Sequence, residues 1–354
     1  MSNANHSEIS HEIQPTESLL QMIVSPWVSR SIYVAAELGI ADLLKDGSQS
    51  CEELAKQAGV DERSLYRLLR ALASVGVFAE NQLGYFELTP LAECLQSNRK
   101  DSLRGYAIKS GQVWDWQPWG HLLDCIKTGK PVFKNLFGVD IFEYLSEHPE
   151  AGKIYDQSMT SFSAKRIAAI TAEYDFSAIN TLVEVGGGRG SLLASILKAN
   201  VTMKGVLCDV PHVIEGAKQL IAEEELSQRC ELVAGDFFES VPSGGDAYLL
   251  KHIIHDWDDE RAIKILQNCR RVMQPNTKLL VIEMVIPTGN EPFFGKLLDL
   301  QVMLNYPGGC ERTEAEYQAL FEAAGFKLTN IVSTSSALSV IEGVPAKSDR
   351  ISVL

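Results

Sequence analysis

The sequence predicts an α/β protein, in which a Rossmann-like, mostly parallel sheet with helices on both faces follows an all-helical winged-helix domain. From residue 181 onward, short apolar runs alternate with amphipathic segments, as in a parallel sheet wrapped by helices. The stretch Leu182 to Leu193, LVEVGGGRGSLL, indicates a strand, a glycine-rich turn and the start of a helix. The 354 residues also exceed what one hydrophobic core usually organises, so two domains are expected.

The chain is expected to divide into four segments. Residues 1–18 are polar and predict a tail, and residues 19–115 carry the pattern of the winged-helix domain. Residues 116–175 predict a helical linker that contributes to a substrate pocket, and residues 176–354 carry the strands and helices of the sheet domain.

The first domain opens with an apolar helix. Ser25 followed by Pro26 predicts its start, because serine caps free backbone amides and proline is tolerated at the first helical position. Gly39 predicts its end. Its apolar face is expected to contain Trp27, Val34, Ala35 and Leu38.

The pattern of a winged helix-turn-helix follows. Ser50 with Glu53 fits a capping box, Gly59 ends that helix, and Asp61 caps the next one. Residues 78–88 alternate like a small hairpin, and Thr89 before a proline predicts another helix.

A winged helix raises the hypothesis of DNA binding, and Arg63, Arg67 and Arg70 lie on its second helix. Residues 50–90 nevertheless hold six acids against four bases, the wrong balance for contacts with phosphates. We therefore prefer packing of these helices against a second subunit, which predicts a homodimer.

Composition narrows the function classes further. The net charge of −14 disfavours nucleic acid and anionic membranes as partners. The N-terminal residues lack a basic-then-apolar signal, and no run of eighteen apolar residues occurs. The seven scattered cysteines contain no CxxC pair, so we expect reduced thiols and no structural zinc. Together, these features predict a cytoplasmic protein that acts on a small molecule.

Polar residues stand at the ends of the predicted strands, where ligands bind in open α/β sheets. Glu184 ends the first run and can either pair with an ammonium group or order the glycine turn. Asp209 ends the second run, nineteen residues beyond Gly190, where an acid can accept both hydroxyls of a ribose or cap the helix after Pro211.

The remaining runs end in the same way. Asp236 and Phe237 follow the third run and offer a carboxylate to an adenine amino group and a ring to its face, although Phe237 could equally be core. Lys251 ends the fourth run and leads into HIIHDW. Glu283 lies near the end of the fifth run, where alternation could also turn it outward.

The spacing of the glycines indicates which ligand the turn holds. A dinucleotide fingerprint requires a third glycine or an alanine where this chain has Ser191, so a nicotinamide oxidoreductase is disfavoured. An acid at Glu184 before Gly186 and Gly188 instead resembles the loop of class I S-adenosylmethionine-dependent methyltransferases, in which the acid faces a cation.

Beyond this loop, the chain resembles the caffeate- and hydroxyindole-type small-molecule O-methyltransferases, which join a winged-helix dimerisation domain to a class I methyltransferase domain. The resemblance spans nearly the whole chain. The motifs that carry it are 182–190, CDVPHV at 208–213, 235–237, KHIIHDWD at 251–258 and NYPGGCERT at 305–313.

The resemblance implies S-adenosylmethionine as the methyl donor and assigns site residues. It places the donor against Glu184, Gly186, Gly188, Asp209, Asp236, Phe237 and Lys251, with Trp257 near the adenine. It makes His255 the general base, flanked by Glu283 and Glu311. It also matches acceptor-pocket positions to Met159, Phe162, Met303 and Asn305.

Elementary chemistry agrees with a histidine base. A phenol with a pKa of about 10 is ionised to roughly one part in a thousand at neutral pH, so a group must take its proton. Histidine suits this role, and Glu283 or Glu311 could orient the ring of His255. Asp256 is the third candidate partner. His252 lies three residues before His255, but the acids beside the pair lack metal-ligand spacing, so no metal is expected.

The substrate and some alternatives stay open. Trp114, Trp116, Trp119, Phe133, Phe137, Phe142 and Phe162 could wall a pocket for a flat hydroxylated aromatic, although aromatic stripes are more often core. A donor-binding regulator would not need a base, and retention of His255 argues against it. Some relatives use the donor in hydroxylation or decarboxylation, and a nitrogen or carbon target is also conceivable.

Overall fold

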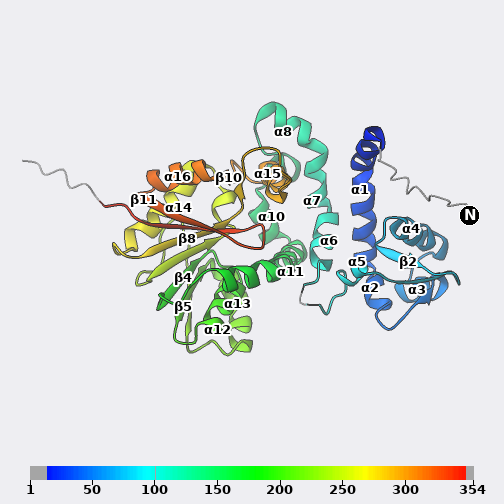
Figure 1. Ribbon diagram of the computed structural model, residues 1–354, viewed down its shortest axis with the longest axis horizontal. Coiled ribbons are helices and arrows are strands. Elements are labelled where there is room, and N and C mark those ends of the chain that lie inside the picture. Colours follow the sequence, from blue (N-terminus) through cyan, green and yellow to red (C-terminus); the bar gives the residue numbers. More distant parts are fainter. Residues whose placement is uncertain (1–13, 100, 348–354) are drawn as a thin grey trace, which may run out of the picture. The chain divides into compact units, whose positions relative to one another are not determined.

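The computed structural model describes residues 14–99 and 101–347, except for the side chains of residues 160–162, 164 and 165. The chain forms two compact units, Met1–Gln112 and Val113–Leu354. Figure 1 shows their helices and strands, many of them labelled.

Unit 1 is a helical domain with a small sheet. The sheet has the order β1-β3-β2 and is antiparallel. Its elements are α1 Pro15–Glu37, α2 Ile40–Leu43, β1 Gln49–Ser50, α3 Cys51–Ala58, α4 Glu62–Ser74, β2 Phe78–Glu80, β3 Tyr85–Leu88, α5 Pro90–Glu93 and α6 Arg104–Gly111.

The predicted start of the first helix is wrong. Helix α1 begins at Pro15 and contains Pro26 in its interior. Proline cannot donate to the carbonyl of Met22, but the Ser25 hydroxyl donates to that carbonyl at 2.8 Å instead. The serine–proline pair therefore continues a helix here. Gly39 has a φ of 67° and follows the helix end, as predicted.

The other local predictions in unit 1 are confirmed. Ser50 and Glu53 form the capping box of α3, and the Asp61 carboxylate accepts from the Ser64 amide at 2.8 Å. Strands β2 and β3 form the predicted hairpin. Strand β1 pairs with β3, so the domain is not all-helical.

Unit 2 begins with helices and continues as an α/β domain (Figure 1). The helical part consists of α7 Val113–Trp116, the 3₁₀ helix η1 Gln117–His121, α8 Leu122–Thr128, α9 Phe133–Phe137, α10 Ile141–Glu147 and α11 Pro149–Glu173. The α/β part consists of β4 Thr181–Val185, α12 Ser191–Ala199, β5 Lys204–Asp209, α13 Pro211–Glu223, β6 Cys230–Ala234, β7 Ala247–Lys251, η2 Ile254–Asp256, α14 Asp259–Val272, β8 Lys278–Glu283, β9 Val285–Ile286, α15 Phe294–Asn305, β10 Arg312–Thr313, α16 Glu314–Ala323, β11 Phe326–Ser333 and β12 Ser339–Pro345.

The main sheet has seven strands in the order β11-β12-β8-β7-β4-β5-β6. Strands β8, β7, β4, β5 and β6 are parallel, whereas β12 runs antiparallel between β8 and β11. The order reverses between β4 and β7, and the carboxyl ends of the parallel strands meet at one edge. The predicted fold class is confirmed.

Two hydrophobic cores cover the faces of this sheet. One contains Leu182, Leu193 and Leu207 with residues of α11, α12 and α13. The other contains Val183, Tyr248 and Leu266 with residues of α14 and α16. Successive residues of β4 enter opposite cores, because side chains alternate along a strand. None of the helices in residues 14–99 and 101–347 has the length and apolar character needed to span a membrane.

Candidate active site

The glycine turn lies between β4 and α12. Gly186, Gly188 and Gly190 have φ angles of 68°, 59° and 80°, which side chains other than glycine rarely adopt. A Cβ at Gly186 would overlap the Ile253 side chain. The turn therefore needs glycine both for its backbone and for its close approach to the segment after β7.

Glu184 lies beneath this turn and is buried. One of its oxygens accepts from the Leu193 amide at 3.2 Å, so Glu184 orders the start of α12. Its other oxygen, Oε1, is buried and has no hydrogen-bond partner among the described residues. Burial raises the pKa of Glu184 to about 7, although the charge of Lys251 opposes this shift.

Asp209 ends β5 and holds the glycine turn from the opposite side. Its Oδ2 accepts from the Gly188 amide at 2.8 Å, and its Oδ1 accepts from the Val210 amide at 2.7 Å. The capping role considered for Asp209 is wrong, because the cap position of α13 is Val210 and no side chain caps this helix.

The residues expected around an adenine lie on neighbouring loops. Asp236 is exposed, and its Oδ1 accepts from the Phe238 amide at 2.8 Å. Phe237 packs partly into the second core, and its ring meets Trp257 edge-on with centroids 6.4 Å apart. The ring of Trp257 also lies 6.4 Å from that of Phe142. Core packing and ligand contact are both compatible with this place for Phe237.

Glu283 at the end of β8 points inward and is fully buried. Its Oε1 accepts from the amides of Ile253 and Ile254 at 3.0 Å each, so it fixes the turn that carries the histidines. Its Oε2 lies 3.4 Å from Nδ1 of His252 and 3.5 Å from Nδ1 of His255.

His255 is buried and surrounded by three carboxylates. Its Nδ1 lies 2.7 Å from Oε1 of Glu311, the shortest of its side-chain contacts. Its Nε2 lies 3.4 Å from Oδ1 of Asp256. Glu311 therefore orients the ring, with Glu283 behind it. Asp256 faces the other nitrogen, which would receive a proton from a substrate.

Burial and the neighbouring charges shift the pKa values of His255 and Asp256. Burial alone would lower the pKa of His255, but Glu283, Asp256 and Glu311 outweigh it and raise the pKa to about 10. Burial raises the pKa of Asp256 to about 7 against the pull of His255. The three carboxylates thus favour the imidazolium form that His255 adopts when it takes up a proton.

His252 is the unexpected member of this cluster. Its φ of 55° is unusual for a residue with a side chain, and its ring stacks on that of His255 with centroids 5.0 Å apart. Burial and then the charge of Lys251 hold the pKa of His252 well below its ordinary value, so it stays neutral. The pKa of Lys251 is also lowered by burial.

A metal was not expected here, but the fold brings Glu283 to the two histidines. One ligand atom of each of His252, His255 and Glu283 lies within 4.8 Å of the others. The Nδ1 of His255 is already engaged with Glu311, and Oε1 of Glu283 with backbone amides. Nδ1 of His252 and Oε2 of Glu283 lie 3.4 Å apart, and neither has a hydrogen-bond partner among the described residues.

The NYPGGCERT segment holds the histidine turn in place. The Arg312 guanidinium is 1% exposed and donates to the carbonyls of Ile254 at 3.0 Å and Trp257 at 2.9 Å. The Cys310 amide donates to the His255 carbonyl at 2.8 Å. A Cβ at Gly309 would lie 2.9 Å from that carbonyl oxygen, which explains the need for glycine. The two motifs therefore form one unit.

The expected acceptor residues lie in different environments. Asn305 is 2% exposed and donates to the Gln301 carbonyl at 2.8 Å, and its Oδ1 has no partner among the described residues. Met303 packs against a small cluster with Cys125 and Leu304. Met159 is partly buried in α11. The side chain of Phe162 lies outside the described residues.

The aromatic residues of the linker divide between core and site. Phe133 is fully buried in a cluster with Trp114 and Tyr306. The ring centroid of Phe142 lies 5.5 Å from that of Tyr306 and 6.4 Å from that of Trp257, so Phe142 contacts both rings. The Tyr155 and Tyr306 hydroxyls lie 3.3 Å apart.

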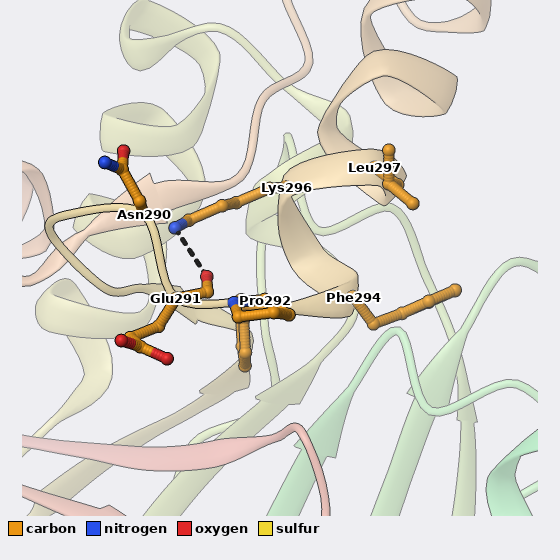
Figure 2. Close-up of a pocket in the computed structure, with 7 residues that line it drawn as sticks. Asn290, Glu291, Pro292, Phe294, Lys296 and Leu297 are labelled. Atoms are coloured by element: carbon orange, nitrogen blue, oxygen red, sulfur yellow. Dashed lines mark hydrogen bonds between the residues drawn. The ribbon is translucent and has the colours of Figure 1, made fainter. Parts of the chain in front are cut away.

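The pocket in Figure 2 is a separate feature. It has a volume of about 430 Å³ and is formed by one segment before and within α15. Lys296 closes its loop by donating to the carbonyls of Gly289 and Glu291. None of the predicted site residues lines this pocket.

Sequence reasoning missed four residues of this site: His252 as a ring partner, Arg312, Tyr155 and Tyr306. Arg312 could have been found, because it follows Glu311 in a motif already singled out. Tyr306 lies in the same motif, but its pairing with Tyr155 could not have been found, because the two residues are 151 positions apart.

Comparisons with known proteins agree with this geometry. A family model described as an O-methyltransferase domain matches residues 119–327, and one described as an O-methyltransferase dimerisation domain matches residues 20–98. The phenazine O-methyltransferase PhzM of Lysobacter antibioticus is 45% identical over 327 residues, which are 92% of this chain and 95% of that protein.

Solved structures share the fold. LaPhzM superposes with a TM-score of 0.90 at 43% identity, covering 94% of this chain and 100% of that chain. NcsB1 from neocarzinostatin biosynthesis, solved with S-adenosylmethionine and 2-hydroxy-5-methyl naphthoic acid, superposes with a TM-score of 0.78 at 30% identity, covering 90% of this chain and 95% of that chain. The family expected from the motifs is confirmed: this chain belongs to the S-adenosylmethionine-dependent O-methyltransferases that carry an N-terminal dimerisation domain.

Proposed function

We propose that this enzyme transfers the methyl group of S-adenosylmethionine to a hydroxyl group of a small aromatic metabolite, with His255 as the general base. The observation that carries this proposal is the arrangement around the imidazole. Glu311 holds Nδ1 at 2.7 Å, and Nε2 is left facing Asp256. This is the arrangement that a base requires, because one nitrogen is anchored and the other can accept a proton.

The residues at the glycine turn fit the donor. Oε1 of Glu184, which is buried and has no partner among the described residues, suits an ammonium group, and the place of Asp209 at the end of β5 supports its assignment to a ribose. We assign donor binding to Glu184, Gly186, Gly188, Asp209, Asp236, Phe237, Lys251 and Trp257. When bound, the donor supplies an electrophilic methyl group.

The protonation of His255 suits an aromatic hydroxyl. Its pKa of about 10 is close to that of a phenol, which makes proton transfer between the two groups nearly balanced. The resulting pair of imidazolium and phenolate is stabilised by Glu311 and Glu283. An aromatic amine is a nucleophile without losing a proton first, so it would not need this cluster.

The acceptor class follows from the aromatic residues and from the relatives. Phe142, Tyr155 and Tyr306 offer flat apolar surface close to Asp256. A relative at 45% identity acts on phenazines, and this supports a hydroxylated fused aromatic ring as the acceptor. We assign Met159, Phe162, Met303 and Asn305 to the acceptor, as the family motifs suggest.

Substitution of the base tests this proposal. His255→Ala should lower kcat with a panel of phenols and hydroxyphenazines by about 10²- to 10⁴-fold, because general base catalysis is lost. Donor affinity, measured by calorimetry, should persist. His121→Ala is the control, because His121 is half-exposed and pairs with Asp124 alone among the described residues. Unchanged turnover in His255→Ala would remove His255 from its role.

A further inference from the structure

The hydroxyl groups of Tyr155 and Tyr306 form a part-buried pair with an unused donor. Tyr155 comes from α11, and Tyr306 follows α15 and is 9% exposed. Their oxygens lie 3.3 Å apart, and neither has another hydrogen-bond partner among the described residues. Two hydroxyls carry two hydrogens, and their mutual bond uses one. One O–H therefore has no acceptor among the described residues, and a bound ligand can supply one.

The pair stays protonated at all relevant pH values. Burial raises the pKa of Tyr155, and the charge of Asp256 raises it further. Burial raises the pKa of Tyr306 well above its ordinary value, to which the charges of Tyr155 and Asp256 add. The pair can thus donate a hydrogen bond but cannot become an anion.

Ring contacts connect the pair to the segment that carries His255, because Phe142 lies beside Tyr306 and its ring centroid is 6.4 Å from that of Trp257, the residue after Asp256. The charge of Asp256 acts on both hydroxyls, and the same carboxylate lies 3.4 Å from Nε2 of His255. An acceptor whose hydroxyl reaches Nε2 would extend its ring along Phe142 toward the pair. Phe142, 5.5 Å from Tyr306, provides a ring surface beside it.

We propose that the Tyr155–Tyr306 hydroxyl pair recognises a second polar atom of the aromatic acceptor, a neutral hydrogen-bond acceptor such as a ring nitrogen or a carbonyl oxygen. A carboxylate at this place would be repelled by Asp256 whenever Asp256 is ionised. A protonated amino group would bring only donors where an acceptor is needed. This inference rests on the proposed function and defines its substrate class more narrowly.

A matched pair of substrates tests the proposal. 8-Hydroxyquinoline and 1-naphthol have the same shape and differ in one ring atom, a nitrogen or a CH group, beside the hydroxyl. 5-Hydroxyquinoline moves the nitrogen away from the hydroxyl. The quantity measured is the ratio of kcat/KM for each quinoline to that for 1-naphthol, which cancels general losses of activity.

The deciding variant is Tyr155→Phe with Tyr306→Phe, which replaces both partners by apolar rings of the same shape and leaves no orphaned hydroxyl. In this variant, the larger of the two kcat/KM ratios of quinoline to 1-naphthol should fall about five- to tenfold below its wild-type value, which corresponds to the free energy of about one hydrogen bond. Tyr144→Phe is the matched control, because Tyr144 lies in the same aromatic cluster and the structure gives its hydroxyl no hydrogen bond among the described residues. It should keep the wild-type ratio.

Two results would count against these ideas and can be told apart. Ratios within about twofold of wild type in the double variant, with donor affinity retained, would overturn the recognition role of the pair. Absence of methylation of every probe by the wild-type enzyme would count against the proposed function itself.

Discussion

At the scale of single residues, the site depends on a histidine whose charge is set by its neighbours. Glu311, Glu283 and Asp256 come from three segments, yet all lie within 3.5 Å of the His255 ring nitrogens. Their charges keep the imidazolium stable in a place where burial alone would remove its proton. Under the proposed function, the position of an aromatic hydroxyl between Nε2 and the donor would decide which oxygen is methylated.

The role of Glu311 predicts a change in pH dependence. With an acceptor that is already ionised at neutral pH, kcat/KM should fall on the alkaline side as His255 loses its proton near pH 10. Glu311→Gln removes a charge that raises the pKa of His255, so this pKa should fall and the alkaline limb should move toward neutral pH. The measurement is a profile of kcat/KM against pH.

Glu314→Gln is the control for this change, because Glu314 is exposed at the start of α16. It should leave the limb in place. An alkaline limb at the same pH in Glu311→Gln and wild type would show that Glu311 does not set the protonation of the base.

At the scale of elements, the glycine turn and the histidine turn constrain each other. Gly186 lies against Ile253, whose amide is held by Glu283. Arg312 donates to the carbonyl of Ile254 in the same turn, and Gly309 lies close to the carbonyl of His255. A change in either turn should therefore affect both donor binding and the base.

Two glycine substitutions separate backbone strain from crowding. Gly186→Ala and Gly188→Ala both place a side chain at a positive φ, but only at Gly186 would the new Cβ meet a neighbour within 4 Å. We expect Gly186→Ala to weaken donor affinity by more than about tenfold relative to Gly188→Ala, because Ile253 must move. Calorimetric titration with S-adenosylhomocysteine measures this, and equal losses in the two variants would exclude the crowding argument.

Local elements could be predicted well, because their determinants are adjacent in sequence. The capping box at Ser50, the cap at Asp61 and the hairpin after Phe78 are all present. The start at Ser25 was wrong for a local reason too, since its hydroxyl can also satisfy the carbonyl that a proline leaves free inside a helix.

The candidate site could be predicted only where a motif contains the residue. The facing of Glu283 was undecided because alternation alone allows both directions, and only the packed sheet turns it inward. The 3₁₀ helix η2 decides which ring nitrogen of His255 lies near Asp256. The contact between Tyr155 and Tyr306 depends on the packing of α11 near the end of α15. Such contacts are tertiary, and no sequence window includes them.

At the scale of the whole molecule, the dimerisation domain leaves an apolar surface uncovered. Met22, Ile23 and Trp27 on α1 are 71%, 65% and 72% exposed. Leu19 and Leu20 extend the same surface, since residues three and four apart share a helix face. We propose that a second copy of the chain covers it, as the description of the matched family model suggests.

Charge placed on this surface should break the dimer. Ile23→Glu with Trp27→Glu would bury two carboxylates in an apolar interface, so the mass in solution should fall to that of one chain of 39.0 kDa. Multi-angle light scattering measures this mass. Val201→Glu is the control, because Val201 is 74% exposed in the other unit and should not change the oligomeric state. A wild-type protein that is already monomeric would contradict the proposal.

The order of the strands has a consequence for the time at which the enzyme becomes active. Strand β8 carries Glu283 between β7 and β12, and β12 comes after every other site residue in the chain. During translation, strand β8 with Glu283 lacks its neighbour β12, and remains an edge strand, until Pro345 has left the ribosome. Nascent chains should therefore be catalytically silent until β12 has been synthesised, and so cannot consume the methyl donor before then.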